Sequence, residues 1–344
     1  MKVVDMHCDT IGAIFEKRNK GIACNLRKND LHLDVNKMEQ GNYLMQNFAM
    51  FIDLKRYKNP YKTLLDMIEC YDKEIEDNKD KLAKVLKYED IVENEANRKI
   101  SSLLTLEEGG ALEGSLENLQ HIYKRGIRMI TLNWNYPNGV GHPNVKINVD
   151  KNGKIIEKPD FTKADKNNGL TPWGFELLEA MEYLGIIPDV SHLSDAGFYD
   201  VLKHSKKPFV ASHSNARSIC NHVRNMDDEM IKLLANKGGV MGINFCAEFI
   251  SPATNGHVFG TISDTIEHIK YIRNIAGIDC IGLGSDYDGI PGNIEMKDCS
   301  YMPRLAHELL KNKFTYDEVE KIFSKNVLRP VSYTHLRAHE TTLH

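Results

Sequence analysis

Short hydrophobic runs rich in β-branched residues recur along the chain, and each run ends in polar or glycine-rich sequence. Runs that are apolar at nearly every position are typical of strands buried on both faces, as in parallel sheets. Eight such runs predict eight strands, at Val3–His7, Tyr43–Ile52, Ile100–Glu107, Met129–Trp134, Ile186–Ser191, Pro208–Ser212, Gly239–Asn244 and Cys280–Ser285.

Between most of these runs, apolar residues recur every three or four positions, which predicts amphipathic helices. These helices are expected at Leu116–Arg125, Trp173–Leu184, Met230–Leu234, Ile262–Ile275, Met302–Leu310 and Tyr316–Leu328. Buried strands that alternate with helices predict an α/β fold, and eight repeats of the unit indicate a (β/α)8 TIM barrel. A doubly wound open sheet is the alternative, but no Gly-x-Gly-x-x-Gly motif follows the first strand.

Two segments interrupt the alternation. Arg56–Asn97 is long and charged, and its pattern predicts one or two helices after the second strand. Val145–Asn168 is polar and has Asn152 and Gly153 between short apolar stretches, which predicts a hairpin with a tight turn. Neither segment has the composition of a linker, so we expect one domain over residues 1–330.

The end of the chain has a different character. Val331–Thr341 reads VSYTHLRAHET, which resembles the translation of a transposase sequencing adapter. Residues 331–344 also contain His335, His339 and His344, so a histidine-rich metal-binding tract is the other interpretation. We expect residues 331–344 to be a non-native tail and the natural end of the protein to be lost near Pro330.

Composition excludes several functional classes. Apolar residues make up 42% of the 344 residues and the net charge is −4, which fits a globular protein and argues against a nucleic-acid partner. No apolar run approaches the roughly 18 residues of a membrane helix, and no signal peptide is visible. The seven cysteines are scattered without a Cys-x-x-Cys motif, which favours free thiols and a cytoplasmic location.

Metal-binding residue types follow five of the predicted strands. The active sites of (β/α)8 barrels lie at the carboxyl ends of the strands, so these side chains are expected to meet at one rim. Each residue taken alone also fits a solvated strand end or a turn, but the set is harder to explain in that way. The residues are His7, Asp9, Glu107, Glu108, His192, His213, Asp286 and Asp288.

The spacing of His7 and Asp9 places an imidazole and a carboxylate on the same side of an extended chain, where both can bind one cation. Two further histidines and a glutamate supply enough ligands for two divalent cations, because a carboxylate can bridge two metals through its two oxygens. Two such cations can acidify a water molecule and polarise a carbonyl group. Nitrogen and oxygen ligands without thiolate favour zinc, and manganese or cobalt less specifically.

Several motifs in the same order make the chain similar to the membrane dipeptidase (renal dipeptidase) family of zinc peptidases. The resemblance runs from about Val3 to Arg329. It implies a metal-dependent hydrolase barrel, two Zn²⁺ ions per chain, a dipeptide as substrate and a homodimer as a common assembly. The matching stretches are VVDMHCDT, TLEEGGALEGSLENL, GIRMITLNWN, GLTPWGFELLEAM, PDVSHLSD, ASHSNARSICNHVRN and IGLGSDYDG.

The resemblance implies a role for each matching metal-binding residue. His7 and Asp9 would bind the first zinc ion, and Glu107 would bridge both ions. His192 and His213 would bind the second ion. The family motif often reads Glu-Gly-Gly, whereas this chain has two glutamates before the glycines, so Glu108 remains the alternative bridge. Asp5 is expected to support the site by orienting one of the ligand histidines.

The resemblance also implies residues for catalysis and substrate binding. Asp286 would shuttle a proton from the attacking water to the leaving amine. Arg224 would bind the carboxylate of the substrate, which suits the forked geometry of a guanidinium. Trp134 stands where some members carry a histidine that contacts the substrate, and His142 in the following loop is a candidate to replace that histidine.

Two other functions fit the same residues. An amidohydrolase acting on another amide or on a lactone would use the same metal rim, and only the arginine argues for peptides. A non-catalytic binding barrel is the second alternative, although intact metal-binding residues argue against it.

Overall fold

The computed structural model describes residues 1–145, 156, 159–251 and 258–337. Within these residues, the strands form one parallel sheet. The strands are β1 Val3–Asp5, β2 Tyr43–Phe51, β3 Leu82–Lys84, β4 Ile100–Glu107, β5 Ile127–Thr131, β6 Ile187–Asp189, β7 Val210–Ala211, β8 Val240–Ile243 and β9 Ile281–Leu283.

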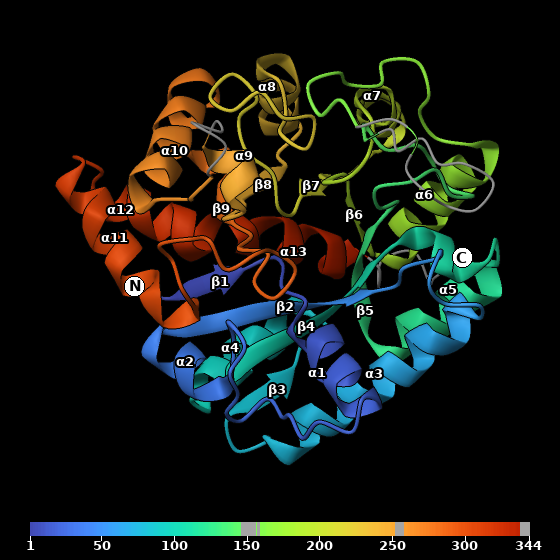
Figure 1. The fold of residues 1–344 in the computed structure, drawn as a ribbon, viewed down its shortest axis with the longest axis horizontal. Helices are drawn as coiled ribbons and strands as arrows, with labels where there is room; N and C mark the ends of the chain where they lie inside the picture. Colours follow the sequence, from blue (N-terminus) through green and yellow to red (C-terminus); the bar gives the residue numbers. More distant parts are fainter. Residues whose placement is uncertain (146–155, 157–158, 252–257, 338–344) are drawn as a thin grey trace.

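The sheet closes into a barrel of eight strands. β1 pairs with β2 along one edge and with β9 along the other, and β2 also pairs with β4. Around the barrel, the order is therefore β1, β2, β4, β5, β6, β7, β8, β9 and back to β1. Figure 1 shows the strands at the centre with the helices around them. The predicted (β/α)8 TIM barrel is confirmed, and a doubly wound open sheet is excluded because the first strand has no free edge.

β3 is a strand that the sequence pattern does not predict. It pairs with Ile100–Ser102 at the start of β4, and β5 takes the same edge of β4 from Leu104 onward. The segment Arg56–Asn97, predicted as helical, is therefore helix α3, strand β3 and helix α4. A strand of three residues is too short to show an alternating pattern, which is why periodicity misses it.

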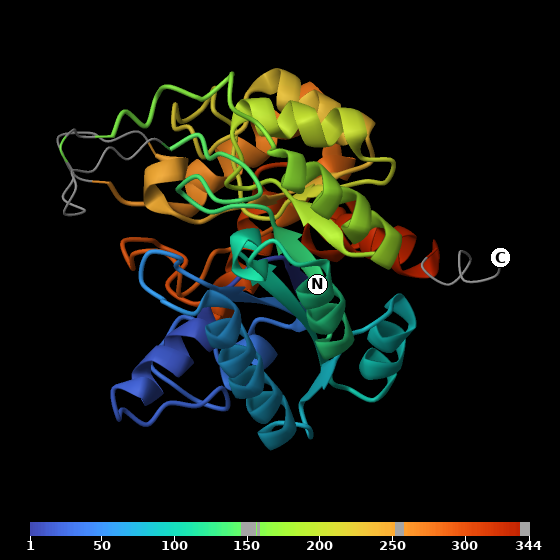
Figure 2. The same ribbon diagram turned by 90° about the vertical axis from the view of Figure 1, so that its right-hand side faces the viewer.

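Helices surround the barrel and cover it from outside. They are α1 Thr10–Asn19, α2 Val35–Gln40, α3 Pro60–Asp77, α4 Tyr88–Ala96, α5 Leu116–Arg125, α6 Pro172–Leu184, α7 Asp195–His204, α8 Asp228–Asn236, α9 Ala247–Ile250, α10 Ile262–Ala276, α11 Met302–Lys311, α12 Tyr316–Glu320 and α13 Asn326–Arg337, with short 3₁₀ turns at Gly109–Leu112, Ile278–Cys280 and Cys299–Tyr301 and a π-helical turn at Lys321–Lys325. In Figure 2, the blue amino-terminal segments and the yellow and orange segments lie on opposite sides of the barrel.

Local sequence explains where several helices begin and end. The side-chain oxygens of Ser115, Thr171 and Ser194 accept backbone N–H groups at the starts of α5, α6 and α7. Gly126 and Gly185 end α5 and α6 in the left-handed conformation that glycine adopts without strain. These capping signals explain why the predicted bounds of α5 agree with the structure.

The predicted hairpin is tested only in part, and the structure has helices that the sequence pattern does not predict. The predicted hairpin at Val145–Asn168 has its turn, Asn152 and Gly153, outside the described residues. The helices α1, α2, α7 and α9 are not predicted by the sequence analysis.

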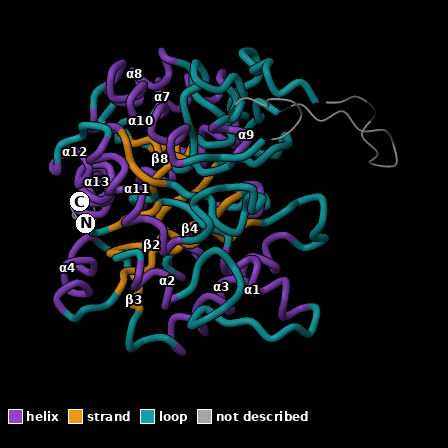
Figure 3. The backbone as a smooth tube through the Cα atoms, turned by 60° about the vertical axis from the view of Figure 1, so that its left-hand side comes forward, coloured by secondary structure: helices purple, strands orange, loops and turns teal. Residues whose placement is uncertain are grey.

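The last helix closes the end of the barrel where the strands begin. Asn326 donates hydrogen bonds to the carbonyl oxygens of Ile278 and Ile281, and Arg329 donates one to Asp279, at the start of β9. Val327 and Val331 of α13 pack in a core cluster with residues from the strands, such as Val4 of β1 and Val240 of β8. Most loops (teal in Figure 3) gather at the opposite end, away from α13.

α13 crosses the predicted boundary between the domain and the tail. The helix continues through Pro330 to Arg337, and Val331 is 3% exposed. The structure therefore places the first residue of the predicted tail in the core. The proposed adapter origin of residues 331–344 stays a prediction.

Two expectations from composition concern membranes and thiols. Among the described residues, no helix combines the length and the apolar character needed to cross a membrane. All seven cysteines are unpaired. The cytoplasmic location stays a prediction.

Candidate active site

Side chains from five strands meet at the carboxyl end of the barrel, as predicted. His7 and Asp9 follow β1, Glu107 ends β4, and His192, His213 and Asp286 follow β6, β7 and β9. His7, His192 and His213 are buried, and so is Glu107. The loops at this rim therefore hold imidazoles and carboxylates against each other with little access to water.

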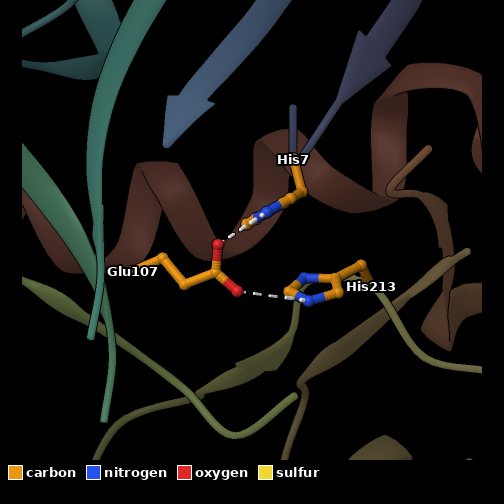
Figure 4. Close-up of side chains that lie close together, drawn as sticks. All are labelled: His7, Glu107 and His213. Atoms are coloured by element: carbon orange, nitrogen blue, oxygen red, sulfur yellow. Dashed lines mark ion pairs between the residues drawn. The ribbon is translucent and has the colours of Figure 1, made fainter. Parts of the chain in front are cut away.

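Glu107 lies between the imidazoles (Figure 4). Its Oε2 atom is 3.3 Å from Nε2 of His7, and its Oε1 atom is 3.0 Å from Nε2 of His192 and 3.8 Å from Nε2 of His213. The rings of His7 and His213 are 3.9 Å apart. One carboxylate oxygen thus faces His7, and the other faces the pair formed by His192 and His213.

The neighbours of His192 and His213 determine which ring nitrogens carry protons. Nδ1 of His192 is 2.8 Å from the amide oxygen of Asn135, so it donates there. Nδ1 of His213 is 2.7 Å from Oγ of Ser212. The Ser212 hydroxyl donates its hydrogen bond to Oδ2 of Asp189, so its oxygen accepts one from Nδ1 of His213. Both Nε2 atoms are then left with lone pairs, and these two atoms are only 2.9 Å apart. A cation between them would relieve the repulsion of the lone pairs.

Asp9 and Asp286 form the other half of the rim. Nε2 of His7 is 3.4 Å from Asp9 and 3.8 Å from Asp286. Asp9 is the N-cap residue of α1, but its carboxylate caps no backbone N–H group. A Cβ atom on Gly289 would lie 2.2 Å from Oδ2 of Asp9 and 2.7 Å from Oδ1 of Asp286. Glycine at this position therefore leaves the space between the two carboxylates open.

Burial and mutual charge shift the pKa values of these groups. Burial, opposed by His7 but helped by Asp9 and Glu107, raises the pKa of Asp286 to about 7. Burial alone would lower the pKa of His7, but Glu107 and Asp9 raise it well above its usual value. Burial would also raise the pKa of Glu107, but the positive charge of His7 holds it below its usual range. The site thus has an excess of negative charge that a proton or a metal ion can balance.

The residues present fit divalent metal ions. Three buried atoms have no hydrogen-bond partner: the two ring nitrogens of His7 and Oδ1 of Asp9. Two sets of candidate ligands bring their atoms within 4.8 Å of one another, His7 with Glu107 and His213, and His7 with Asp9 and Asp286. Buried atoms of this kind without partners are costly unless a metal uses them. Three imidazoles and three carboxylates without thiolate match the preferences of zinc.

Glu108 has a different environment from Glu107. Its carboxylate accepts hydrogen bonds from the backbone N–H groups of Gly110 and Trp134, at 2.8 and 3.1 Å, and from the side chain of Asn138. Burial raises its pKa to about 7. These contacts bind Glu108 to the loop after β4, so the geometry places Glu107, and not Glu108, among the histidines.

Asp5 holds the backbone of the site and not an imidazole. Its carboxylate accepts the N–H group of His7 at 3.2 Å and both the N–H and the hydroxyl of Ser285, at 2.9 and 2.6 Å. Asp5 therefore orients His7 through its backbone and not through its ring. In this way, Asp5 fixes the ends of β1 and β9 from which His7 and Asp286 extend.

Arg224 lies beside the candidate metal ligands and is 4% exposed. Its Nη2 atom is 2.9 Å from Nε2 of His192, and Nη1 donates to the carbonyl oxygen of Ser191. Nε has no hydrogen-bond partner. Among the described residues, no carboxylate forms an ion pair with this guanidinium within 4.0 Å, so its charge is available for an anionic ligand.

A cavity of about 160 Å³ lies over the ligands, and Arg224, Trp134 and Phe249 line it. The ring of Trp134 is 4.8 Å from Phe51 and 6.2 Å from His192, so Trp134 forms a wall of this cavity. His142 does not line the cavity, and its Nδ1 atom is 2.9 Å from the carbonyl oxygen of Gly169. The hypothesis that His142 replaces a substrate-binding histidine is therefore not supported by its position.

Sequence reasoning misses the amides that support the site. Asn135 contacts Nδ1 of His192, and Nδ2 of Asn244 donates to Oδ2 of Asp286 at 2.9 Å. Asn244 directly follows β8, and Asn135 lies in the loop that begins after Thr131, the last residue of β5. Their place at the rim was a usable signal, but asparagine is so common in loops that it does not stand out.

The comparisons with known proteins agree with this geometry. A family model described as membrane dipeptidase (peptidase family M19) matches residues 1–343. The chain belongs to the membrane dipeptidase family. It is therefore a metal-dependent hydrolase that acts on dipeptides, and the predicted family, fold and activity are confirmed.

Two relatives of this dipeptidase are similar over most of its length. An uncharacterized dipeptidase of Schizosaccharomyces pombe is 31% identical over 324 residues, which cover 89% of this chain and 73% of the relative. An uncharacterized protein from the pqqA 5′ region of Klebsiella pneumoniae is 31% identical over 240 residues, which cover 70% of this chain and 84% of that protein.

Solved structures show the same fold. Dipeptidase AC, a metallopeptidase of family M19, superposes with a TM-score of 0.86 at 21% identity, covering 97% of this chain and 99% of that chain. A metallopeptidase of Rhodobacter sphaeroides, with a phosphinate mimic of the dipeptide L-Ala-D-Ala bound, gives a TM-score of 0.83 at 20% identity with the same coverage. These similarities support the barrel assignment of the dipeptidase.

Proposed function

We propose that this dipeptidase uses two Zn²⁺ ions, held by His7, Asp9, Glu107, His192 and His213. The observation that carries the proposal is the position of Glu107, whose two carboxylate oxygens face different histidines. A carboxylate placed in this way fits a bridge between two ions. His7 and Asp9 would hold one ion, and His192 and His213 the other.

Bound zinc ions would supply a Lewis acid that acidifies water and polarises the peptide carbonyl. Asp286 is suited to move the proton, because its carboxylate lies 3.8 Å from Nε2 of His7 at the metal rim and Asn244 fixes its Oδ2 atom by a hydrogen bond of 2.9 Å. Its carboxylate would accept a proton from the attacking water and donate it to the leaving nitrogen of the dipeptide.

Arg224 would bind the terminal carboxylate of the substrate. The guanidinium is buried beside the ligands, and its Nε atom has no hydrogen-bond partner. If Nε2 of His192 binds a metal, it no longer accepts from Arg224, which frees Nη2 for the substrate. A buried clamp for a carboxylate would favour very short peptides. Trp134 and its neighbour Phe51 would form one wall of the space that the substrate occupies.

Hydrolysis of dipeptides by metal-free and zinc-loaded protein tests this proposal. We expect cleavage of dipeptides, but not of tripeptides, only after zinc is added, with about two ions bound per chain. Asp286→Asn should lower kcat by a factor of about 100 or more while the bound zinc stays unchanged. Activity that is fully retained with one ion per chain would contradict the binuclear site. The homodimer and the cytoplasmic location expected from the sequence stay predictions.

A further inference from the structure

A second cavity of about 600 Å³ adjoins the active site. The two cavities share Arg224, Phe249, Asn135, Cys246 and Pro291 in their walls. The proposed carboxylate clamp therefore stands at the junction between the metal rim and the second cavity, which we call the side chamber. No role in the proposed reaction uses the side chamber.

Aromatic rings form one wall of the side chamber. Phe161 stacks on His222 with ring centres 5.0 Å apart and an interplanar angle of 16°, and His222 lies 4.6 Å from Phe249. The guanidinium carbon of Arg224 is 5.4 Å from the centre of the Phe249 ring. Phe161, His222, Phe249 and Arg224 thus form a row of adjacent groups along the chamber, and the row ends at the proposed carboxylate clamp.

His222 belongs to this wall as an uncharged ring. Its Nδ1 atom accepts the N–H group of Arg224 at 3.1 Å, which requires a lone pair on that nitrogen. Burial and the positive charge of Arg224 lower its pKa to about 4, so the ring is neutral near pH 7. Phe161 is 38% exposed in spite of its apolar ring. An apolar wall that faces an open cavity is suited to cover an apolar ligand group.

The geometry points to the side chamber as the binding site for the side chain of the carboxyl-terminal residue of the dipeptide, with a preference for large aromatic side chains. This inference rests on the proposed function, because it takes the substrate carboxylate to be bound by Arg224. In a dipeptide, the carboxylate and the carboxyl-terminal side chain are attached to the same carbon atom. A carboxylate on Arg224 therefore directs that side chain into one of the spaces beside the guanidinium, and the side chamber is such a space.

The charged groups of the chamber do not favour a basic side chain instead. Glu248 also lines the chamber, but it is exposed to solvent and its Oε2 atom lies 3.1 Å from the thiol of Cys246. An exposed carboxylate attracts a cation weakly because water screens the charge. The aromatic wall and the neutral His222 offer more contact to a ring than to an ammonium group.

Binding of phosphinate dipeptide analogues tests the inference without requiring turnover. Three analogues with the same amino-terminal residue would carry a methyl, a benzyl or an aminobutyl group on the carboxyl-terminal side, as in alanine, phenylalanine and lysine. Titration calorimetry on the zinc-loaded protein should show that the benzyl analogue binds at least tenfold more tightly than the other two. Equal binding, a preference for the methyl or aminobutyl analogue, or no binding of the benzyl analogue would overturn the inference.

Phe161→Ala gives a second measurement, because this half-exposed side chain lines only the chamber. The variant should reduce the ratio of benzyl to methyl affinity at least threefold. Tyr183→Ala removes an exposed aromatic ring on α6 and serves as the matched control, for which the ratio should not change. An unchanged ratio in Phe161→Ala would contradict the assignment of the aromatic wall.

Hydrolysis of the matching dipeptides separates this inference from the proposed function. Tight binding of the benzyl analogue without cleavage of alanyl-phenylalanine would support the chamber and contradict the proposed catalysis. Cleavage without the benzyl preference would support the catalysis and contradict the chamber.

Discussion

At the scale of single residues, Asp189 organises one half of the metal rim from behind. This buried carboxylate accepts hydrogen bonds from the hydroxyl groups of Thr131, Ser191 and Ser212, at 2.6, 2.7 and 2.6 Å. Because the hydroxyl of Ser212 donates to Asp189, its oxygen accepts a hydrogen bond from Nδ1–H of His213 at 2.7 Å. Asp189 therefore acts through Ser212 to leave the lone pair of His213 on Nε2, where a metal can use it.

Removing the hydroxyl of Ser212 should weaken zinc binding. We expect Ser212→Ala to lower the zinc affinity by a factor of about 10 to 100, because the ring of His213 loses the partner that fixes its orientation. Competition with a chromophoric chelator measures this affinity directly. Ser212→Thr keeps a hydroxyl and should bind zinc more tightly than Ser212→Ala; equal affinities in the two variants would contradict the role of the hydroxyl.

A second residue-scale prediction concerns a histidine outside the active site. His268 is fully buried, its Nδ1 accepts the N–H group of Ala216 at 3.1 Å, and its Nε2 contacts the carbonyl oxygen of Ile250 at 2.9 Å. Burial lowers its pKa to about 4, although the bond to Ile250 opposes this shift. Since the pKa is near 6.5 in the unfolded chain, the unfolded state binds the proton first as the pH falls.

The stabilisation from neutral His268 is therefore complete above about pH 6.5 and is lost as the pH falls towards 4. His268→Gln cannot titrate in this range, so its free energy of unfolding should fall by less between these pH values. The difference from the wild type should approach about 3 kcal/mol. Urea unfolding at several pH values measures this slope, and parallel curves for the two proteins would disprove the assignment. His268→Asn serves as a second neutral variant.

The residues that bear the chemistry could be predicted from sequence, whereas those that support it could not. His7, Asp9, His192, His213 and Asp286 follow apolar runs directly, and all five lie at the rim. The sequence favours Glu107 over Glu108 as the bridge, and the structure agrees, because Glu107 contacts the histidines whereas Glu108 is held in the loop after β4. The contacts of Asn135, Asn244 and Asp189 join different strands, so no local pattern reveals them.

At the scale of secondary-structure elements, the barrel and α13 meet through close packing. A Cβ atom on Gly282 of β9 would lie 2.7 Å from Cγ2 of Val327 and 3.0 Å from Cγ1 of Val240. β9 therefore has space only for glycine where the helix covers it. Because residue 282 has no side chain, Val327 of α13 can pack directly against β9.

Two substitutions at this contact should compensate each other. Val327→Ala removes buried carbon atoms and should cost about 2 kcal/mol of unfolding free energy. Gly282→Ala alone should cost about 1–3 kcal/mol because the new methyl group meets Val327. The double variant should lose at least about 0.5 kcal/mol less than the two single losses combined, as measured by urea unfolding. Val85→Ala, in the same core cluster, is the control that should combine with Gly282→Ala additively.

The elements themselves were predictable to different degrees. Long, wholly buried strands such as Ile100–Glu107 have the predicted bounds, because every residue of β4 is buried. Shorter strands are less well predicted: β7 is only Val210–Ala211, whereas the predicted strand is Pro208–Ser212. β3 has no pattern of its own, since its position depends on the part of the edge of β4 that β5 leaves free.

At the scale of the whole molecule, the proposed metal ligands connect distant parts of the sequence. His7 and Asp9 lie near the start of the chain and Asp286 near its end, with Glu107, His192 and His213 between them. A metal held by these groups would bind the closed barrel and not the unfolded chain. Metal binding should therefore stabilise the fold as a whole.

Removal of zinc should lower the thermal stability. At a free zinc concentration about 1,000 times the dissociation constant, each independent site would add about 4 kcal/mol to the free energy of unfolding. Calorimetry of the chelator-treated protein should thus give a lower Tm than the zinc-loaded protein. His7→Ala, which removes a member of both ligand sets, should reduce this difference, and an equal Tm shift in the variant would show that zinc acts elsewhere.

The contact between β1 and β9 has a consequence for synthesis on the ribosome. Asp5 and Ser285, which fix the two ends of the site, are 280 residues apart. At roughly 5–20 residues per second, the first strand would wait roughly 15–60 s for its partner. During this interval, one edge of β1 has no partner strand, although β2 can already pair with the other edge. A chaperone that protects open strand edges would therefore have a binding site on this protein until β9 has been translated.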